Sequence, residues 1–278
     1  MGMAVDVNHP PKVCIFCGGT PPTKEHVISD WLGTLLPKSG LNYGVTDVTI
    51  DSQEPKTVRR VRSGHPISRR VKRVCRGCNG GWMKGLVDAS KPLVTRLVQG
   101  QSCRVSRQDQ EVLAAWIAVA VVVSEWERRD WVTVPPGDRD KLWKTHRPPD
   151  TWKIWVGDYR RESWKPQLIH QRYSVTRNDH PQVEGGARGR SNTQSTTYVV
   201  GRLFVHVLSS EVLYEGVDLQ FQGANARLLR QIWPPSEFSV LWPPPTMDDR
   251  DADRIAGAMM QAALRGLGLP SLEKLIPP

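Results

Sequence analysis

Two pairs of cysteines constrain the fold of this chain more than any other feature of its sequence. Each pair has the spacing Cys-x-x-Cys, and 57 residues separate Cys17, which ends the first pair, from Cys75, which begins the second. Two such thiolate pairs can bind one tetrahedral Zn²⁺, so the intervening segment must leave the first pair, form structure of its own and return. The alternatives are unrelated cysteines or a redox role, and the latter lacks its usual thioredoxin-like context. We predict one structural zinc ion bound by Cys14, Cys17, Cys75 and Cys78.

The positive charge of the chain is concentrated in the segment that holds these cysteines. The formal net charge is +10; residues 1–104 contain 16 Lys and Arg against 7 Asp and Glu, whereas residues 105–278 contain 22 against 21. Charge that served only to keep the protein soluble would not be expected to concentrate in one third of the chain. Neutralisation of phosphates with release of counterions supplies most non-specific affinity for nucleic acid. The first third of the chain is therefore expected to have a polyanionic partner.

Nine basic residues and no acidic residue lie between positions 56 and 76. The wider segment 41–74 carries spaced valines in a Thr-rich context, which is typical of strands. The two patterns predict a basic ribbon that contacts the phosphates of nucleic acid, in preference to an ordinary solvated face. Its residues are Lys56, Arg59, Arg60, Arg62, Arg69, Arg70, Lys72, Arg73 and Arg76.

The remaining composition favours a cytoplasmic protein. Residues 1–11 lack the apolar core of a signal peptide and are expected to form a disordered lead-in. The longest apolar run, Val112–Val123, has 12 residues, which is too short to span a bilayer and predicts a buried helix. Five cysteines without a secretion signal argue against a disulfide scaffold, and Cys103 is expected to be a buried small apolar side chain.

We predict an α+β protein in two parts, with a boundary near residues 100–106. The first part, 12–104, contains a short helix capped by Ser29, the strands of 41–74 and helical spacing after Asn79, with a new turn or helix from Ser90. The second part, 105–278, is a Trp-rich α+β domain with a long helix capped by Ser106. Its other expected elements are a short helix at 139–146, strands near 151–157, 168–175 and 197–208, a loop at 177–196 and an amphipathic helix from Asp248.

Glu25, His26 and Asn79 supply the side-chain types of a second, catalytic metal site. A carboxylate binds a hard cation such as Mg²⁺ or Mn²⁺, and a neutral imidazole can deprotonate a water molecule near ambient pH. If 24–28 is a strand, Glu25 and His26 point to opposite faces and differ in role. Asn79 follows Cys78 directly, so bound zinc would fix where its amide oxygen points. We predict that His26 generates the nucleophile and that Glu25 and Asn79 hold the cation; an ordinary surface Glu-His pair is the alternative.

The order Cys-x-x-Cys, Glu-His-Val-Ile, Cys-x-x-Cys-Asn resembles the HNH endonucleases, the ββα-metal nucleases, and in particular their four-cysteine branch. The stretch from Cys75 to Met83 is also similar to bacterial HNH-containing proteins with an Asn-x-Gly-Trp-Met helix. The resemblance covers residues 12–90. It implies a metal ligand at Glu25, a general base at His26 and a second metal ligand at Asn79.

Two positions depart from the pattern of that family. Its acidic position is often Asp or His, and Glu25 is one methylene longer than Asp. The Asn that orients the base from a few residues before the second cysteine pair is missing, and Arg69 and Arg70 stand in that neighbourhood. The sequence therefore does not identify the residue that positions His26.

Nine of the eleven tryptophans lie after residue 104. Tryptophan can stack on the bases of single strands, and Trp152 with Trp155 would form such a platform. The near-neutral charge of this half favours the alternative, in which the tryptophans pack inside the protein. The domain is expected to cover one side of the nuclease module or to select a partner or substrate. The scattered histidines are assigned no role: His146, His170, His180 and His206.

We therefore expect a divalent-metal-dependent endonuclease that hydrolyses phosphodiester bonds of nucleic acid, with DNA favoured over RNA and no membrane contact. Its cofactors are a structural Zn²⁺ and a catalytic Mg²⁺ or Mn²⁺. Contacts to the phosphate backbone imply weak sequence preference. One alternative is a non-catalytic zinc-knuckle protein that only binds nucleic acid. Another is a toxin or phage-defence nuclease effector that a protein partner activates; a homo-oligomer or a regulatory partner is compatible with the sequence.

Overall fold

The computed structural model describes residues 13–20, 22–36, 42–50, 56–63, 68–128, 132–160, 168–173, 191–211 and 220–266. For 42–50, 56–63 and 259–266 it describes the backbone alone. Three expectations lie outside the described part: the lead-in at 1–11, positions 177–190 of the loop, and the side chains of Lys56, Arg59, Arg60 and Arg62.

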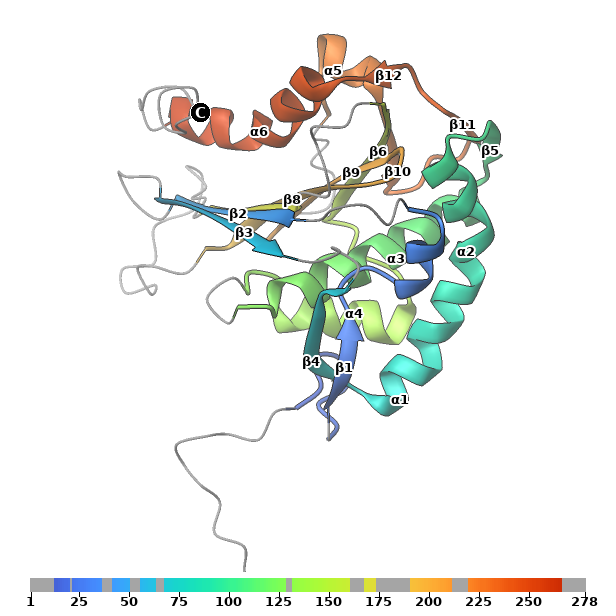
Figure 1. Cartoon of the computed structure of the whole chain (residues 1–278), viewed down its shortest axis with the longest axis vertical. Helices are drawn as coiled ribbons and strands as arrows, with labels where there is room; N and C mark the ends of the chain where they lie inside the picture. Colours follow the sequence, from blue (N-terminus) through green and yellow to red (C-terminus); the bar gives the residue numbers. More distant parts are fainter. Residues whose placement is uncertain are drawn as a thin grey trace, which may run out of the picture.

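Strands and helices are mixed along the chain, which confirms the predicted α+β class (Figure 1). The strands are β1 (Pro22–His26), β2 (Asn42–Ile50), β3 (Lys56–Ser63), β4 (Arg70–Cys75), β5 (Cys103–Val105), β6 (Lys153–Tyr159), β7 (Leu168–Tyr173), β8 (Thr193–Val200), β9 (Leu203–Ser210), β10 (Leu229–Trp233), β11 (Val240–Trp242) and β12 (Thr246–Met247). The helices are η1 (Asp30–Thr34), α1 (Arg76–Cys78), η3 (Asn79–Met83), α2 (Lys84–Gln99), α3 (Arg107–Glu125), α4 (Pro136–Thr145), α5 (Gly223–Leu228) and α6 (Asp249–Gly266).

One large sheet of eight strands has the order β10-β6-β9-β8-β7-β2-β3, with β12 beside β6. The pairs β2·β7 and β12·β6 are parallel, and the other neighbours in this sheet are antiparallel. The hairpin β2–β3 lies between the two cysteine pairs in sequence, yet it extends a sheet whose other strands all follow residue 152. The segment between the two cysteine pairs therefore extends away from the first pair and returns to the second, as predicted. Its strands belong to the large sheet and not to a self-contained module.

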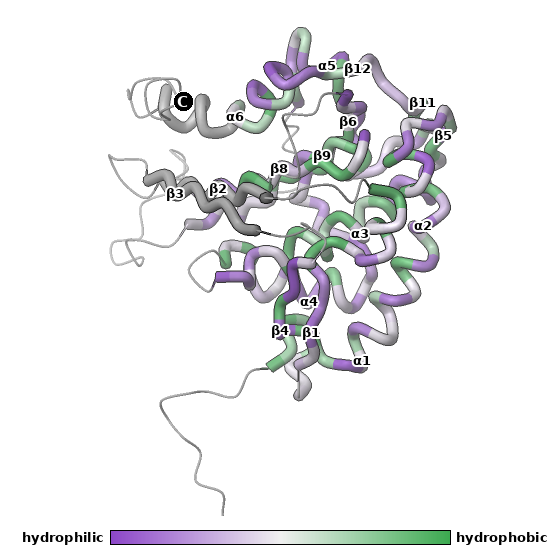
Figure 2. Tube along the Cα trace, in the orientation of Figure 1, coloured by the Kyte–Doolittle hydropathy of each residue, from purple (hydrophilic) through white to green (hydrophobic). Residues whose placement is uncertain are grey.

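Helices lie on both faces of the large sheet (Figure 1), α3 and α4 on one and α6 on the other. The main hydrophobic core fills the first interface and reaches the cysteines; it joins Leu32 and Leu97 to Ile117 and Val205. A second, smaller cluster lies between the sheet and α6. Much of β9 and of α3 is apolar (Figure 2). The main core thus runs without interruption across the predicted boundary at residues 100–106.

Helix α3 is the central element of that core, and it begins where the sequence predicts. The Ser106 hydroxyl accepts a hydrogen bond from the Asp109 backbone N–H, and the Asp109 carboxylate accepts one from the Ser106 N–H in return. This capping box satisfies two backbone donors that the first turn of a helix leaves unpaired. Among the described residues, no helix combines the length and apolar character needed to cross a membrane.

Three predicted boundaries differ from the structure. The loop expected at 177–196 ends earlier, because residues 193–196 form the first half of β8. Helix α2 continues through Pro92, where a new turn or helix was expected. Pro92 removes the bond to the carbonyl of Asp88, and both residues are exposed, so water can satisfy that carbonyl. The strand expected at 197–208 is two strands, β8 and β9, joined by a turn at Gly201, whose φ is 56°.

The tryptophans of the second half pack inside the protein where they are described. Trp152 is 0% exposed and Trp155 is 5% exposed. The indole N–H of Trp152 donates to the Asp138 carboxylate at 2.6 Å. A stacking platform for bases at Trp152 and Trp155 is therefore wrong, and the packing alternative is confirmed for this pair.

Candidate metal centre and the adjoining pocket

The two cysteine pairs are brought together by the pairing of β1 with β4. These strands are antiparallel, with Pro22 opposite Cys75 and His26 opposite Arg70. The first pair sits in a turn that precedes β1, in which the Gly18 N–H bonds the Cys14 carbonyl and Gly18 adopts a left-handed φ of 71°. The second pair spans the end of β4 and the short helix α1. A residue with a side chain would strain the turn at Gly18.

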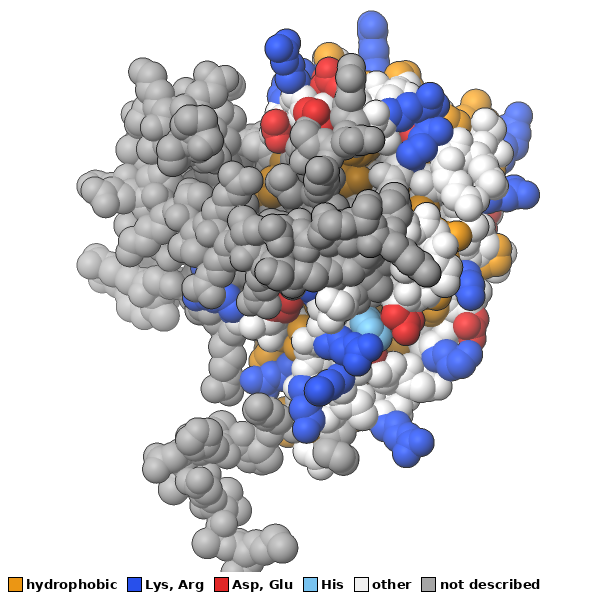
Figure 3. All heavy atoms as spheres, in the orientation of Figure 1, with side chains coloured by type: hydrophobic (Ala, Val, Ile, Leu, Met, Phe, Trp, Pro, Cys, Tyr) orange, Lys and Arg blue, Asp and Glu red, His pale blue; other side chains and the backbone are white. Residues whose placement is uncertain are grey.

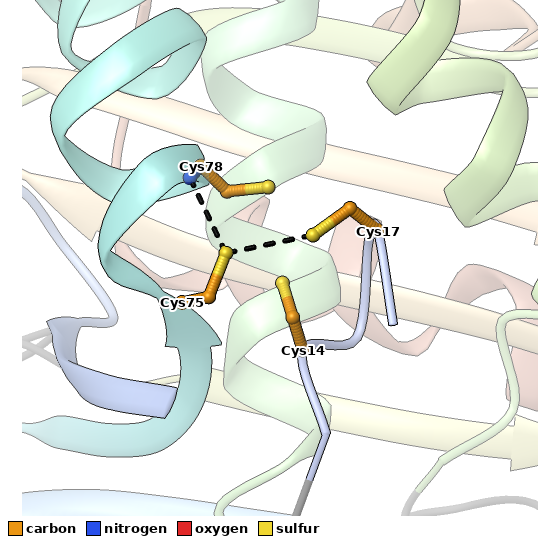
Figure 4. Close-up of side chains that lie close together, drawn as sticks. All are labelled: Cys14, Cys17, Cys75 and Cys78. Carbon is orange, nitrogen blue, oxygen red and sulfur yellow. Dashed lines mark hydrogen bonds between the residues drawn. The ribbon is translucent and has the colours of Figure 1, made fainter. Parts of the chain in front are cut away.

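The four sulfur atoms form one compact cluster (Figure 4), and they all lie within 4.8 Å of one another. The sulfurs of Cys17 and Cys75 are 3.5 Å apart. Backbone N–H groups point at the cluster from both turns: Gly19 donates to Cys17 Sγ and Cys78 donates to Cys75 Sγ, each at 3.4 Å. Within the described ranges this is the only group of three or more His, Cys, Asp or Glu side chains close enough to hold a metal ion. The predicted clustering of the cysteines is confirmed.

The thiols of the cluster have unequal acidities. Burial raises the pKa of Cys17 and of Cys78 above its ordinary value. Burial acts in the same direction at Cys75, but hydrogen bonds from the Cys78 N–H and from neighbouring thiols outweigh it, and the pKa of Cys75 falls to about 7. A thiol must lose its proton to ligate a metal, so Cys75 does so more readily than Cys17 or Cys78.

Aromatic side chains cover one side of the cluster. Trp82 makes an edge-to-face contact with Phe16, with ring centroids 5.2 Å apart, and stacks on His146 at 5.3 Å. His146 follows α4, so the second part of the chain shields the residues next to the second cysteine pair. Sequence reasoning assigned His146 no role, and nothing in its local sequence signals this contact.

Glu25, His26 and Asn79 line a single pocket of about 300 Å³ beside the cluster. Glu25 and His26 are neighbours in β1 and share the pocket even though alternation along a strand predicts opposite faces; His26 is the last residue of β1. The side-chain amide of Asn79 donates to Thr23 Oγ1 at 3.4 Å, which leaves its oxygen available. The structure thus brings together the three residues that the sequence selected.

Burial and neighbouring charges shift the pKa values of Glu25 and His26 in opposite directions. Burial, reinforced by the negative charge of Asp30, raises the pKa of Glu25 to about 7. Burial also lowers the pKa of His26; the positive charge of Arg70 lowers it further and Asp30 opposes this. Asp30 lines the same pocket and was missed by the sequence analysis. At neutral pH the imidazole of His26 is therefore uncharged.

Arg70 is the partner of His26 that the sequence did not identify. Its Nε donates to Nε2 of His26 at 2.8 Å, across the β1–β4 pair. Arg69, the other candidate, points into the protein instead. It is 4% exposed, and its guanidinium pairs with both carboxylate oxygens of Glu127.

The basic ribbon is therefore smaller than predicted. The assignment of Arg69 to a phosphate-contacting surface is wrong, because its charge is buried and neutralised by Glu127. Arg73 is partly buried, with its guanidinium 5.0 Å from the ring centre of Trp126. Arg70, Lys72 and Arg76 are exposed. Lys and Arg side chains gather over the β1–β4 region on the face shown in Figure 3.

Comparison of the chain with models of protein families, with curated proteins and with solved structures gave no match.

Proposed function

We propose that this protein is a divalent-metal-dependent endonuclease that hydrolyses phosphodiester bonds of nucleic acid, with DNA favoured over RNA. The observation that carries the proposal is the shared pocket of Glu25, His26 and Asn79, directly beside the four-thiol cluster. The three residues come from β1 and from the start of η3, 53 positions apart between His26 and Asn79, so a specific fold is needed to unite them. Their agreement with the HNH pattern supports the same reading.

The four thiols would hold a structural Zn²⁺. Four thiolates and N–H groups directed at sulfur are the donor set of closed zinc sites, which leave no position for substrate. The ion would tie the turn before β1 to the end of β4 and to α1. It would thereby fix Asn79, the residue after Cys78, against the strand that carries His26.

Glu25 and Asn79 fit a hard cation such as Mg²⁺ or Mn²⁺. Both offer oxygen donors to the pocket, and the raised pKa of Glu25 indicates a carboxylate whose negative charge lacks compensation. When bound, the cation would supply charge stabilisation for the leaving oxygen. Asp30 adds negative charge to the same pocket and would strengthen its attraction for a cation.

His26 would act as the general base and Arg70 as its positioning residue. With Arg70 donating to Nε2, the lone pair of that nitrogen is engaged and the neutral ring carries its proton on Nδ1. A phosphate that enters the pocket would compete for the exposed guanidinium of Arg70. Transfer of Arg70 to the phosphate would free Nε2 to take a proton from water, so that base activation and substrate binding are coupled.

The exposed cations near the pocket would hold the nucleic-acid backbone. Lys72 and Arg76 are exposed on β4 and α1, and Lys24 and Lys84 line the pocket itself. Contacts of this kind neutralise phosphates without reading bases, which predicts strong salt dependence and weak sequence preference.

The proposal is tested by the His26→Ala variant in a plasmid-nicking assay with Mg²⁺ or Mn²⁺. We expect nicking to be lost while zinc content and the melting curve stay unchanged. Lys144→Ala is the control, because Lys144 is exposed on α4 and lies outside the pocket. Nicking by His26→Ala at the wild-type rate refutes the mechanism.

The same assay separates the two alternatives. A wild-type protein that binds DNA with every divalent cation tested but never cuts it is a zinc-knuckle binding protein. A protein that cuts only after addition of cell extract is an effector that requires a partner.

A further inference from the structure

The pocket at Glu25 and His26 has an apolar half that hydrolysis of a phosphodiester does not require. Its polar lining is Lys24, Glu25, His26, Ser29, Asp30, Asn79 and Lys84, and its apolar lining includes Trp31, Met83, Leu86, Val87, Trp116, Val119 and Ala120. A cation and a phosphate interact with the polar half. The apolar half fits a different part of the substrate.

Helix α3 contributes to the wall of the pocket through two residues that are more exposed than their neighbours in the helix. Between Leu113 and Glu125 every residue is buried except Val119 and Ala120, which are partly exposed. Both line the pocket. Exposed apolar side chains on an otherwise buried helix carry a cost in water, which a planar apolar ligand would remove.

The volume of the pocket and the residues that line its apolar half indicate which ligand fits there. The whole pocket has a volume of about 300 Å³, which leaves room for one small planar group beside a phosphate. Nucleobases bind in such places between apolar and aromatic side chains when they leave the stack. Trp31, which is partly exposed, supplies aromatic surface next to the residues that would bind the phosphate.

We propose that the pocket receives one unpaired nucleobase next to the scissile phosphate. This inference rests on the proposed function and names its substrate class: single-stranded, bulged or otherwise distorted nucleic acid. A base in a regular duplex must first unpair and unstack, which slows cleavage at paired sites. In this proposal α3 forms one wall of the substrate site, and the other walls come from β1, η1, η3 and α2.

Cleavage rates of matched DNA substrates test the inference. The substrates share one sequence around the cut and differ only in being paired, bulged by one nucleotide, or abasic at the nucleotide beside the cut. We expect kcat/KM of the wild type to be about tenfold or more higher for the bulged than for the paired site. Ala120→Phe, which fills the pocket, should lower cleavage of the bulged site at least tenfold and of the abasic site less than threefold.

Ala89→Phe is the matched control, since Ala89 is exposed on α2 and outside the pocket. If Ala120→Phe melts below the assay temperature, Ala120→Leu replaces it. Equal rates on paired and bulged sites, together with wild-type rates for the filled variant, overturn the base pocket while leaving the endonuclease intact.

Crosslinking gives a readout that does not depend on activity. A 5-iodouracil beside the scissile phosphate, bound to His26→Ala and irradiated, should crosslink to Trp31 or Met83, and Ala120→Phe should abolish the crosslink. If wild-type protein cuts no substrate, the proposed function fails, and the crosslink alone decides the pocket. A crosslink confined to residues outside the pocket overturns the inference.

Discussion

Arg69 and Arg70 are adjacent in sequence, yet the structure predicts opposite consequences for their substitution. Arg69 pairs with Glu127, and the two side chains are 2% and 6% exposed. Removing one partner of a buried ion pair leaves the other charge without compensation, which costs about 3–5 kcal/mol. Arg69→Met should therefore lower the free energy of unfolding by about that amount, and Tm by roughly 5–15 °C.

Arg70→Met is the matched comparison, because it removes the same group from an exposed side chain. Its free energy of unfolding should change by about 0.5 kcal/mol or less. Cleavage should fall because His26 loses its partner, and the slope of log K against log salt should decrease in magnitude by about 1 if Arg70 contacts a phosphate. Arg69→Met should leave that slope unchanged.

The assays are urea and thermal unfolding followed by circular dichroism, and DNA binding at several salt concentrations. Replacing both partners, in Arg69→Met with Glu127→Leu, should restore much of the stability, since two apolar side chains leave no buried charge. If Arg69→Met is as stable as the wild type but loses one phosphate contact, the assignment of the two arginines is reversed and the reasoning fails.

Two further predictions concern stability. Cys75→Ser should unfold the region around the cluster and release zinc, because metal binding and folding are one equilibrium at such sites; a cooperative melt with wild-type Tm would contradict a structural zinc. Burial raises the pKa of Glu125 to about 8, against the opposing effect of hydrogen bonds from the Thr133 and Val134 N–H groups. A carboxyl whose pKa is higher in the folded than in the unfolded state binds more protons when folded, so this contribution to stability is complete below pH about 4.5 and declines as pH rises to about 8. In Glu125→Gln the decline across this window should be smaller in urea melts, and an unchanged pH dependence would show that Glu125 does not titrate there.

Local patterns were enough to predict the elements that depend on local interactions. The Ser106 cap and the apolar run after it predict α3, because a capping box and an uninterrupted apolar segment act within a few residues. The cysteine spacing predicts the thiol cluster for the same reason: each pair forms its own turn, and one ion or one core joins the two. Glu25, His26 and Asn79 were selected by their side-chain chemistry and their positions after the cysteine pairs, and the structure places them in one pocket.

What the sequence could not predict depends on pairing across long distances. The parallel pairing of β2 with β7 joins residues more than a hundred positions apart. The valine pattern of β2 predicts a strand but does not indicate which other strand it pairs with. The bond between Arg70 and His26 depends on the register of β1 with β4, which shifts between Thr23 and Lys24. A run of basic residues likewise gives no sign that Arg69 is buried against Glu127.

We propose that His26 acts as a base in a pocket that supports phosphodiester hydrolysis. The most direct measurement is the single-turnover rate of cleavage by zinc-loaded protein with excess Mg²⁺, on one bulged DNA, for the wild type and His26→Ala. A positioned general base contributes about 10²–10⁴-fold, so the rate of His26→Ala should fall by that factor while DNA affinity stays within about twofold. Equal single-turnover rates for the two proteins would show that His26 is not the general base.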